Sequence, residues 1–177
     1  MKKGIDNTSF QNIANEANIS VGLIQHNFSS KEKILQYAMN LVINRIEERA
    51  TKRLHVFSGT KEETLRRIIK FLIPIDHEEI IEARVWVSFL GRSFSNPNLF
   101  ELQQKMDRYS RKMMQMIINL MIDLGYLNKE EENQFELEII YAFIDGLVMH
   151  ALQSPEVYTE EKVDQIIEYY LMNKRRE

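Results

Sequence analysis

Apolar side chains along this chain recur at intervals of three and four residues, the spacing that places them on one face of an α-helix. One such stripe, from Ser30 to about Arg53, predicts a long amphipathic helix. A second stripe stops at Pro74, which cannot continue a helix. Asp76 and Glu79 then fit a capping box that would open the next helix.

The second half of the chain continues the same pattern. The longest stripe ends before Gly125, a natural helix stop. A helix from about Glu130 to Leu152 is apolar on more than one face, and Thr159 begins a last amphipathic helix. No convincing strand pattern interrupts these segments. The sequence therefore predicts an all-α protein of about eight or nine helices.

The segment TSFQNIANEANISVGLIQHNF predicts two short helices joined by a tight turn. Thr8 with Gln11 fits a capping box, Asn18 suits a left-handed turn, and Ser20 can cap the second helix. Two helices at so tight a turn form a helix-turn-helix. The long helix that follows can be capped by Ser29 with Glu32.

Apolar side chains of this segment would pack the two helices together and leave Val21, Gln25 and His26 pointing outward. The apolar set is Phe10, Ile13, Ala14, Ala17, Ile19, Leu23 and Ile24.

Composition limits what the chain can do. Its 177 residues, 44% of them hydrophobic, can bury one core or a small module attached to a larger one. The chain has no cysteine, which excludes disulfides and thiolate zinc sites and suits a cytoplasmic protein. Its apolar runs are too short to span a bilayer, so we expect no membrane partner. The four histidines lack metal-ligand spacing, and no catalytic constellation stands out. We therefore expect no metal, no cofactor and no enzymatic activity.

Charge is distributed unevenly along the chain. Up to Arg53 there are eight cations and five anions, a net charge of +3, so −6 remains for the rest. A basic N-terminal part on an acidic body is compatible with a polyanionic partner at one end.

The stretch TSFQNIANEANISVGLIQHNFSSKEKIL resembles the DNA-binding module of the tetracycline-repressor (TetR) family of bacterial transcription regulators. The matching residues are Thr8 or Ser9, Ile13, Ala14, Ala17, Ile19, Ser20, Gly22, His26, Phe28, Lys31 and Leu35. The resemblance implies a helix-turn-helix domain over residues 1–48 and a helical ligand-binding and dimerisation domain over residues 49–177. It also implies operator DNA, a small-molecule effector and a second copy of the chain as partners.

The chain departs from the family pattern at three points. Asn18 replaces the frequent turn glycine, and Gln25 replaces the usual aromatic residue of the recognition helix with an amide that can pair with adenine. The family also places a whole helix before GIDNTS, where this chain has only Met1–Lys3. The first helix is therefore expected to be missing or truncated, with mobile first residues and Phe10 and Ile13 more exposed than core positions.

The resemblance and the chemistry of the side chains assign DNA contacts. Hydroxyl and backbone groups at the helix starts suit phosphates, and the polar face of the second helix suits base edges. The candidate DNA-binding residues are Thr8, Ser9, Ser20, Val21, Gly22, Gln25, His26 and Lys31. The alternative is that the hydroxyl residues act as caps only and the polar residues form a solvated face.

Two further sets of residues are expected in the body. Aromatic and methionine residues on two consecutive helices suit an effector pocket, with plain core packing as the alternative; the candidates are Trp86, Phe89, Phe94, Met106, Tyr109, Met113 and Met116. A wide apolar arc around Gly146, with the last helix, suits a four-helix dimer interface, with a helix central in its own monomer as the alternative. Its candidates are Ile140, Phe143, Ile144, Leu147, Val148, Ala151, Ile166, Ile167, Tyr170 and Leu171.

These expectations combine into a homodimeric repressor in which a small hydrophobic effector shifts the spacing of the two DNA-binding heads, so that they no longer match successive major grooves. The alternative is a helical small-molecule-binding dimer whose incomplete head does not bind DNA.

Overall fold

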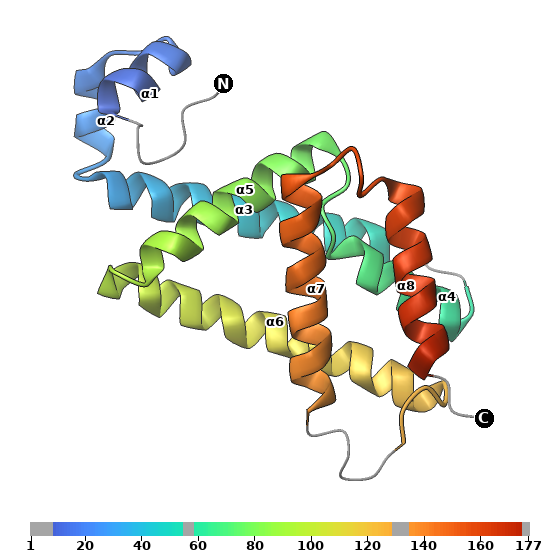
Figure 1. Ribbon diagram of the computed structural model, residues 1–177. Coiled ribbons are helices and arrows are strands. Elements are labelled where there is room, and N and C mark those ends of the chain that lie inside the picture. The colour runs from blue at the N-terminus through green and yellow to red at the C-terminus, as the bar shows by residue number, and fades with distance from the viewer. Residues whose placement is uncertain (1–8, 55–58, 129–134, 175–177) are drawn as a thin grey trace. The chain divides into compact units, whose positions relative to one another are not determined.

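Helices account for the regular structure of the computed structural model, which describes residues 9–54, 59–128 and 135–174. Within these ranges the helices are α1 (Phe10–Ala17), α2 (Val21–Asn27), α3 (Lys31–Leu54), α4 (Lys61–Phe71), α5 (His77–Ser93), α6 (Pro97–Asp123), α7 (Glu136–Gln153) and α8 (Glu160–Lys174) (Figure 1). The predicted all-α fold is confirmed.

The start of α1 is set by a serine cap. Ser9 Oγ accepts a hydrogen bond from the Asn12 N–H at 3.1 Å. Thr8 lies outside the described residues, and Gln11 donates to Asn15 at 3.0 Å instead of reaching back to a cap. The predicted capping box is therefore wrong by one residue, because either of two adjacent hydroxyl side chains can cap a helix that begins next to it.

The turn between α1 and α2 forms as predicted. Asn18 adopts a left-handed conformation, with φ 54° and ψ 44°, and its N–H bonds to the carbonyl groups of Ala14 and Asn15. Ser20 Oγ then accepts from the Leu23 N–H at 3.1 Å and caps α2. These two local features produce the helix-turn-helix.

Caps also set the starts of later helices. Ser30 Oγ, and not the predicted Ser29, accepts from the Lys33 N–H at 3.3 Å at the start of α3. The predicted capping box at α5 is confirmed, since Asp76 Oδ1 accepts from the Glu79 N–H at 2.8 Å and the Glu79 carboxylate accepts from the Asp76 N–H.

The predicted stops hold as well. Helix α4 ends before buried Pro74, and α6 ends at Asp123, two residues before Gly125 with φ 77°. The described part of α7 begins at Glu136; the predicted start near residue 130 lies outside the described residues.

Contacts group the chain into two units. The first contains residues up to Lys52 together with Arg84–Gln103, and the second contains Arg53–Ala83 together with the chain from Gln104 onward. The division into domains at residue 48, drawn from the sequence, stays a prediction.

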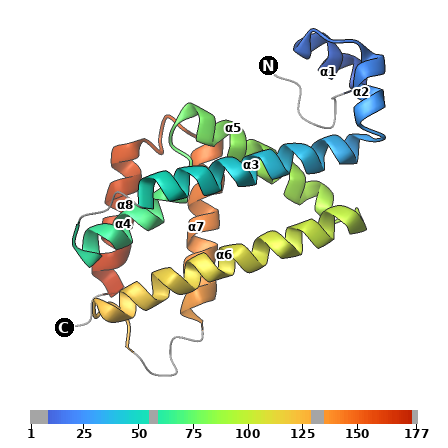
Figure 2. The same cartoon turned by 180° about the vertical axis from the view of Figure 1, so that it is seen from behind.

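Each unit has its own buried apolar residues. In the first, these come from α1, α2, α3, α5 and α6: Ala14, Ile24, Leu35, Met39, Val42, Phe89 and Leu99. In the second, α7 and α8 lie side by side and antiparallel (Figure 1, Figure 2), and their inward faces contribute Ile140, Ile144, Leu147, Ala151, Val163, Ile167 and Leu171.

Candidate DNA-binding and effector sites

The second helix of the helix-turn-helix presents a polar face. Gln25 and His26 are exposed on α2, Gly22 is exposed in its first turn, and Lys31 is exposed at the start of α3. Val21, predicted to point outward, is half-buried. The exposed side chains offer an amide, an imidazole and an ammonium group. These groups can donate hydrogen bonds to acceptor atoms on base edges and phosphates.

The hydroxyl residues of the head have a structural role. Ser9 is half-buried and Ser20 exposed, and each caps a helix. A capping oxygen accepts from the backbone, but the hydroxyl hydrogen remains available to donate. Capping is therefore compatible with a phosphate contact.

The apolar packing of the head differs from the prediction. Phe10 and Ile13 are half-buried, as expected. Ala17, Ile19 and Leu23 are exposed, with Ile19 43% and Leu23 48% accessible, so their assignment to the packed faces is wrong. The reason is geometric: two helices of eight and seven residues cover only the side chains at their contact.

The predicted effector residues fall in both units. Phe89 is fully buried, Trp86 is half-buried, and Phe94 is 76% exposed in the first unit. In the second unit, Met106 and Met113 are half-buried on α6, whereas Tyr109 and Met116 on the same helix are exposed. Their role in binding an effector stays a prediction.

A polar cluster that the sequence did not reveal joins α6 to α7. Tyr141 Oη donates to Asp107 Oδ1 at 3.3 Å, and Arg111 Nε donates to Asp107 Oδ2 at 2.9 Å. Arg111 also pairs with Glu138. Asp145, one turn beyond Tyr141, has its pKa raised by burial and by the negative charge of Asp107. The available signal was the one-turn spacing of Tyr141 and Asp145 within the otherwise apolar stretch 139–149.

Burial has the same effect on the phenol. It raises the pKa of Tyr141 above its ordinary value, and the Asp107 carboxylate adds to this shift. The cluster therefore holds more acidic than basic side chains at a half-buried position.

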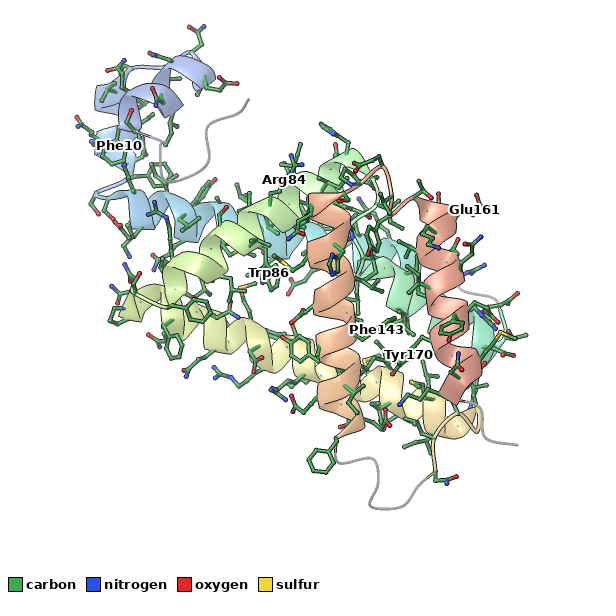
Figure 3. The ribbon with its side chains drawn as sticks, viewed as in Figure 1. Phe10, Arg84, Trp86, Phe143, Glu161 and Tyr170 are labelled. Atoms are coloured by element: carbon green, nitrogen blue, oxygen red, sulfur yellow. The ribbon has the colours of Figure 1, made fainter. Side chains whose placement is uncertain are left out.

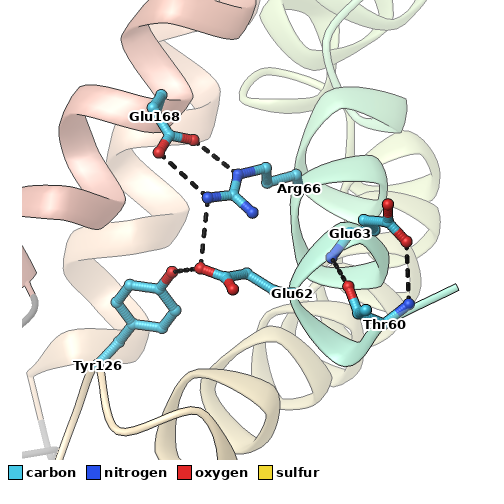
Figure 4. A network of polar contacts seen from close by, with 6 residues as sticks. All are labelled: Thr60, Glu62, Glu63, Arg66, Tyr126 and Glu168. Carbon is cyan, nitrogen blue, oxygen red and sulfur yellow. Dashed lines mark hydrogen bonds and ion pairs between the residues drawn. The ribbon is translucent and has the colours of Figure 1, made fainter.

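A second polar network joins α4 to α8 and to Tyr126, which follows the end of α6 (Figure 4). Arg66 donates to both carboxylate oxygens of Glu168, at 2.6 and 3.1 Å, and to Glu62 at 3.4 Å. Tyr126 Oη donates to the same Glu62 oxygen at 2.5 Å. The bond to Glu168 raises the pKa of Arg66. One turn further along α4, Lys70 pairs with Glu160 and Asp164 of α8.

An open groove of about 620 Å³ lies along the same two helices. Its lining includes Arg66 and Lys70 from α4, and Ile167, Tyr169 and Met172 from α8. The basic side chains on its wall are already paired with carboxylates, so the groove offers mainly apolar contact.

Most residues predicted at the dimer interface pack within the second unit. Seven are buried there: Ile140, Ile144, Leu147, Val148, Ala151, Ile167 and Leu171. Ile166 is half-buried, and the rings of Phe143 and Tyr170 stack between α7 and α8 with centroids 4.4 Å apart (Figure 3). Their part in an interface stays a prediction.

The described residues contain neither a metal-binding cluster nor a membrane-spanning helix. No group of three or more potential ligands among His, Cys, Asp and Glu could hold a metal ion, and no helix is long and apolar enough to cross a membrane.

Comparison with known proteins identifies the family of this chain. Residues 1–38 match the family described as bacterial regulatory proteins, tetR family, and residues 61–175 match that of the BetI-type transcriptional repressor, C-terminal. The chain belongs to the TetR family of transcription regulators, and its body is of the BetI type. This membership confirms the predicted family and the expectation that the chain is not an enzyme, and it implies DNA as a partner. The predicted loss of the first helix is not confirmed.

Curated relatives and solved structures agree with this assignment. The chain is 28% identical over 167 residues to the regulator PksA of Bacillus subtilis, covering 94% of the chain and 80% of PksA. It is 23% identical over 169 residues to BetI of Escherichia coli K12, covering 95% and 84%. A regulator from Saccharomonospora viridis, solved in complex with choline, superposes with a TM-score of 0.81 at 23% identity, covering 97% and 88%. A regulator from Rhodococcus has the same fold, with a TM-score of 0.78 at 23% identity and coverage of 97% and 87%.

Proposed function

We propose that the chain is a ligand-responsive transcriptional repressor that binds operator DNA as a homodimer and is released by a small effector. The observation that carries the proposal is the exposed face of α2, where Gln25 and His26 are free of core packing, in a chain whose body is of the BetI type. Two such faces in a dimer would read two half-sites in successive major grooves.

Repression by this mechanism needs two states of the dimer with different separations of the heads. An effector that binds one state more tightly shifts the population toward that state. The size of the shift is limited by the difference between its binding free energies for the two states. Binding in the body would thus lower operator affinity.

The effector we propose is a small organic cation of the choline type. The solved relative from Saccharomonospora viridis contains choline. In this chain, the half-buried Asp145 carboxylate near the Tyr141 side chain supplies the complementary chemistry, a negative charge and an aromatic ring, which attract a quaternary ammonium group. An aromatic ring next to a half-buried carboxylate favours a bulky cation over a small, strongly hydrated one.

The experiment measures operator binding and effector binding separately. Fluorescence anisotropy with duplexes that flank the gene of this protein should reveal a specific site, and choline should weaken binding to it. Choline should also raise the melting temperature, as any ligand selective for the folded state does, and change the Trp86 fluorescence. Asp145→Asn should abolish all three choline effects and leave operator binding without choline intact.

The alternative function, a helical small-molecule-binding dimer without DNA activity, gives a different combination of results. Choline would raise the melting temperature, but no duplex from the flanking region would bind better than scrambled DNA. Specific operator binding with no response to choline would instead retain the repressor and reject the cationic effector.

A further inference from the structure

Arg111 lies within the polar cluster between α6 and α7, next to the groups that would receive the effector. We infer that Arg111 acts as a resident cation that restricts the effector to a single positive charge, because it engages Asp107 and leaves Asp145 as the carboxylate for the ligand. The inference rests on the proposed cationic effector and adds the charge that this effector can carry and the residue that determines it.

The guanidinium of Arg111 binds carboxylates on both helices. Its Nε donates to Asp107 Oδ2 at 2.9 Å on α6, and its two Nη atoms donate to the two Glu138 oxygens on α7, at 2.5 and 3.3 Å. The other oxygen of Asp107 accepts from the Tyr141 hydroxyl at 3.3 Å. The bonds to Glu138 and Asp107 raise the pKa of Arg111 and keep the group charged. Both carboxylates therefore already have a cationic partner within the chain.

Arg111 also covers part of the aromatic ring of the cluster. Its Cζ lies 5.7 Å from the centroid of the Tyr141 ring, within the range of a cation–π contact. A ligand that took the same place would have to displace a guanidinium held by three hydrogen bonds. An effector cation can therefore use the ring only where Arg111 does not cover it.

Asp145 differs from the other two carboxylates of the cluster. It is half-buried one turn beyond Tyr141, and no described residue donates a hydrogen bond to it or forms an ion pair with it. Burial and the negative charge of Asp107 both raise the pKa of Asp145. A ligand with one positive charge would supply the counter-charge that this carboxylate lacks.

A second positive charge on the same ligand has no such partner. Asp107 and Glu138 are bound by Arg111, so the second charge would lie close to the guanidinium. Like charges repel more strongly in a partly dehydrated site than in water. Without the cation at position 111, the cluster would instead present three carboxylates and would favour a ligand with two positive charges.

The test uses three ligands of similar shape that differ in charge. The monocation is trimethyl(3-hydroxypropyl)ammonium, which is choline lengthened by one methylene. The dication has an ammonium group in place of the hydroxyl, and the neutral analogue is 4,4-dimethylpentan-1-ol, with carbon in place of the quaternary nitrogen. Titration calorimetry on the full chain measures each dissociation constant. The wild-type protein should bind the monocation more tightly than the neutral analogue and gain nothing from the second charge.

Two variants should change this preference in opposite directions. Arg111→Met removes the resident charge and should tighten binding of the dication roughly tenfold or more relative to the monocation. Asp107→Asn leaves the Arg111 charge less compensated and should weaken binding of both cations, the dication more. Neither variant should alter the affinity for the neutral analogue. Lys105→Met removes a charge from an exposed residue on the other side of α6 and, as the control, should change nothing.

A purely structural role for Arg111 predicts a different result, because loosening the contact between α6 and α7 affects all three ligands alike. Equal shifts for the two cations in Arg111→Met, or a wild-type preference for the dication, would overturn the inference and retain the cationic effector. If Arg111→Met does not fold, as judged by circular dichroism, Asp107→Asn decides the question: unchanged binding of both cations would overturn the inference.

The outcomes also separate the inference from the proposed function. If neither cation binds the wild-type protein or Arg111→Met more tightly than the neutral analogue does, the inference and the cationic effector fail together. Operator binding, measured without any of these ligands, then still decides whether the chain is a repressor.

Discussion

Tyr126 shows how a single hydroxyl can join three segments of the body. The side chain is only 4% exposed, and its hydroxyl donates to the Glu62 oxygen that also accepts from Arg66, which in turn binds Glu168 on α8. Tyr126→Phe keeps the ring but leaves this carboxylate one donor short. We expect the free energy of unfolding to fall by about 1–2 kcal/mol. Urea denaturation measures the loss, and Tyr169→Phe, at an exposed ring, should change nothing. Equal effects from the two variants would contradict a special role for this hydroxyl.

Asp145 makes stability depend on pH in a defined direction. Burial and the Asp107 charge raise its pKa in the folded state, so the folded protein holds this proton more tightly than the unfolded chain does. Its contribution is therefore favourable below the unfolded pKa and is lost as the pH rises through the folded pKa. Asp145→Asn should raise the melting temperature at neutral pH, and the gain should vanish in acid. A gain that is constant across the pH range would show that charge is not the cause.

Local signals at single residues were largely readable in the sequence. Asn18, Ser20 and the Asp76 capping box were placed correctly because each acts on backbone groups within four residues of itself. The caps at Ser9 and Ser30 were misplaced by one position, since two hydroxyl residues stand side by side at both starts. Pairs such as Arg66 with Glu168 join residues 102 positions apart, and no periodicity in the sequence contains that information.

At the scale of elements, the turn between α1 and α2 depends on one backbone conformation. Asn18 has φ 54°, where asparagine is tolerated and a residue with an ordinary Cβ is strained by roughly 1–2 kcal/mol. Asn18→Gly should therefore leave thermal stability nearly unchanged, whereas Asn18→Ala should lower it. Calorimetry on the two variants provides the comparison. An alanine variant as stable as the glycine variant would mean that the turn readjusts without strain.

Helix α7 shows what hydrophobic pattern alone cannot decide. Its apolar residues cover most of its circumference, so the sequence indicated a helix with two contact surfaces but not which of them faces its own unit. The residues expected at the interface, such as Leu147, are buried, while Ile139 and Met149 are exposed. The assignment needs the positions of α6 and α8, which both contact α7, and these positions depend on tertiary packing.

This difference between the two faces is measurable. Leu147→Glu should unfold the chain or lower its melting temperature strongly, because it buries an unpaired charge in the core of the unit. Ile139→Glu, at an exposed position, should leave the melting temperature of the isolated chain almost unchanged. Circular dichroism at low protein concentration makes the comparison. Similar losses in both variants would contradict the burial assigned to the two faces.

For the whole molecule, the family could be predicted because its most specific residues are contiguous, within Thr8–Leu35. The effector residues could not be settled in the same way. The candidates were chosen as aromatic or methionine residues, and they range from the fully buried Phe89 to the exposed Phe94. The cluster between α6 and α7 consists mainly of polar residues, so a criterion based on apolar side chains does not select it. Chemistry that depends on residues from separate helices is visible only after folding.

Two kinds of contact contribute to DNA recognition by the whole molecule, contacts to base edges and contacts to phosphates. Gln25 is exposed on α2 and can bond an adenine edge, so Gln25→Ala should weaken binding to the operator by roughly 1–3 kcal/mol and hardly affect scrambled DNA. Lys31, exposed at the start of α3, would instead neutralise a phosphate. Lys31→Ala should therefore weaken binding to both duplexes alike and reduce the slope of log affinity against log salt by about one per head. Anisotropy titrations over a range of salt concentrations measure both quantities.

Gln165→Ala, an exposed amide on α8, is the matched control and should change neither the operator affinity nor the salt slope. If Gln25→Ala lowers the affinity for operator and scrambled DNA equally, Gln25 contacts the DNA backbone. Other residues of α2 must then recognise the sequence. If neither head variant alters affinity, DNA must bind through another surface, because an exposed amide and an exposed ammonium group cannot both lie in a groove interface and contribute nothing to it.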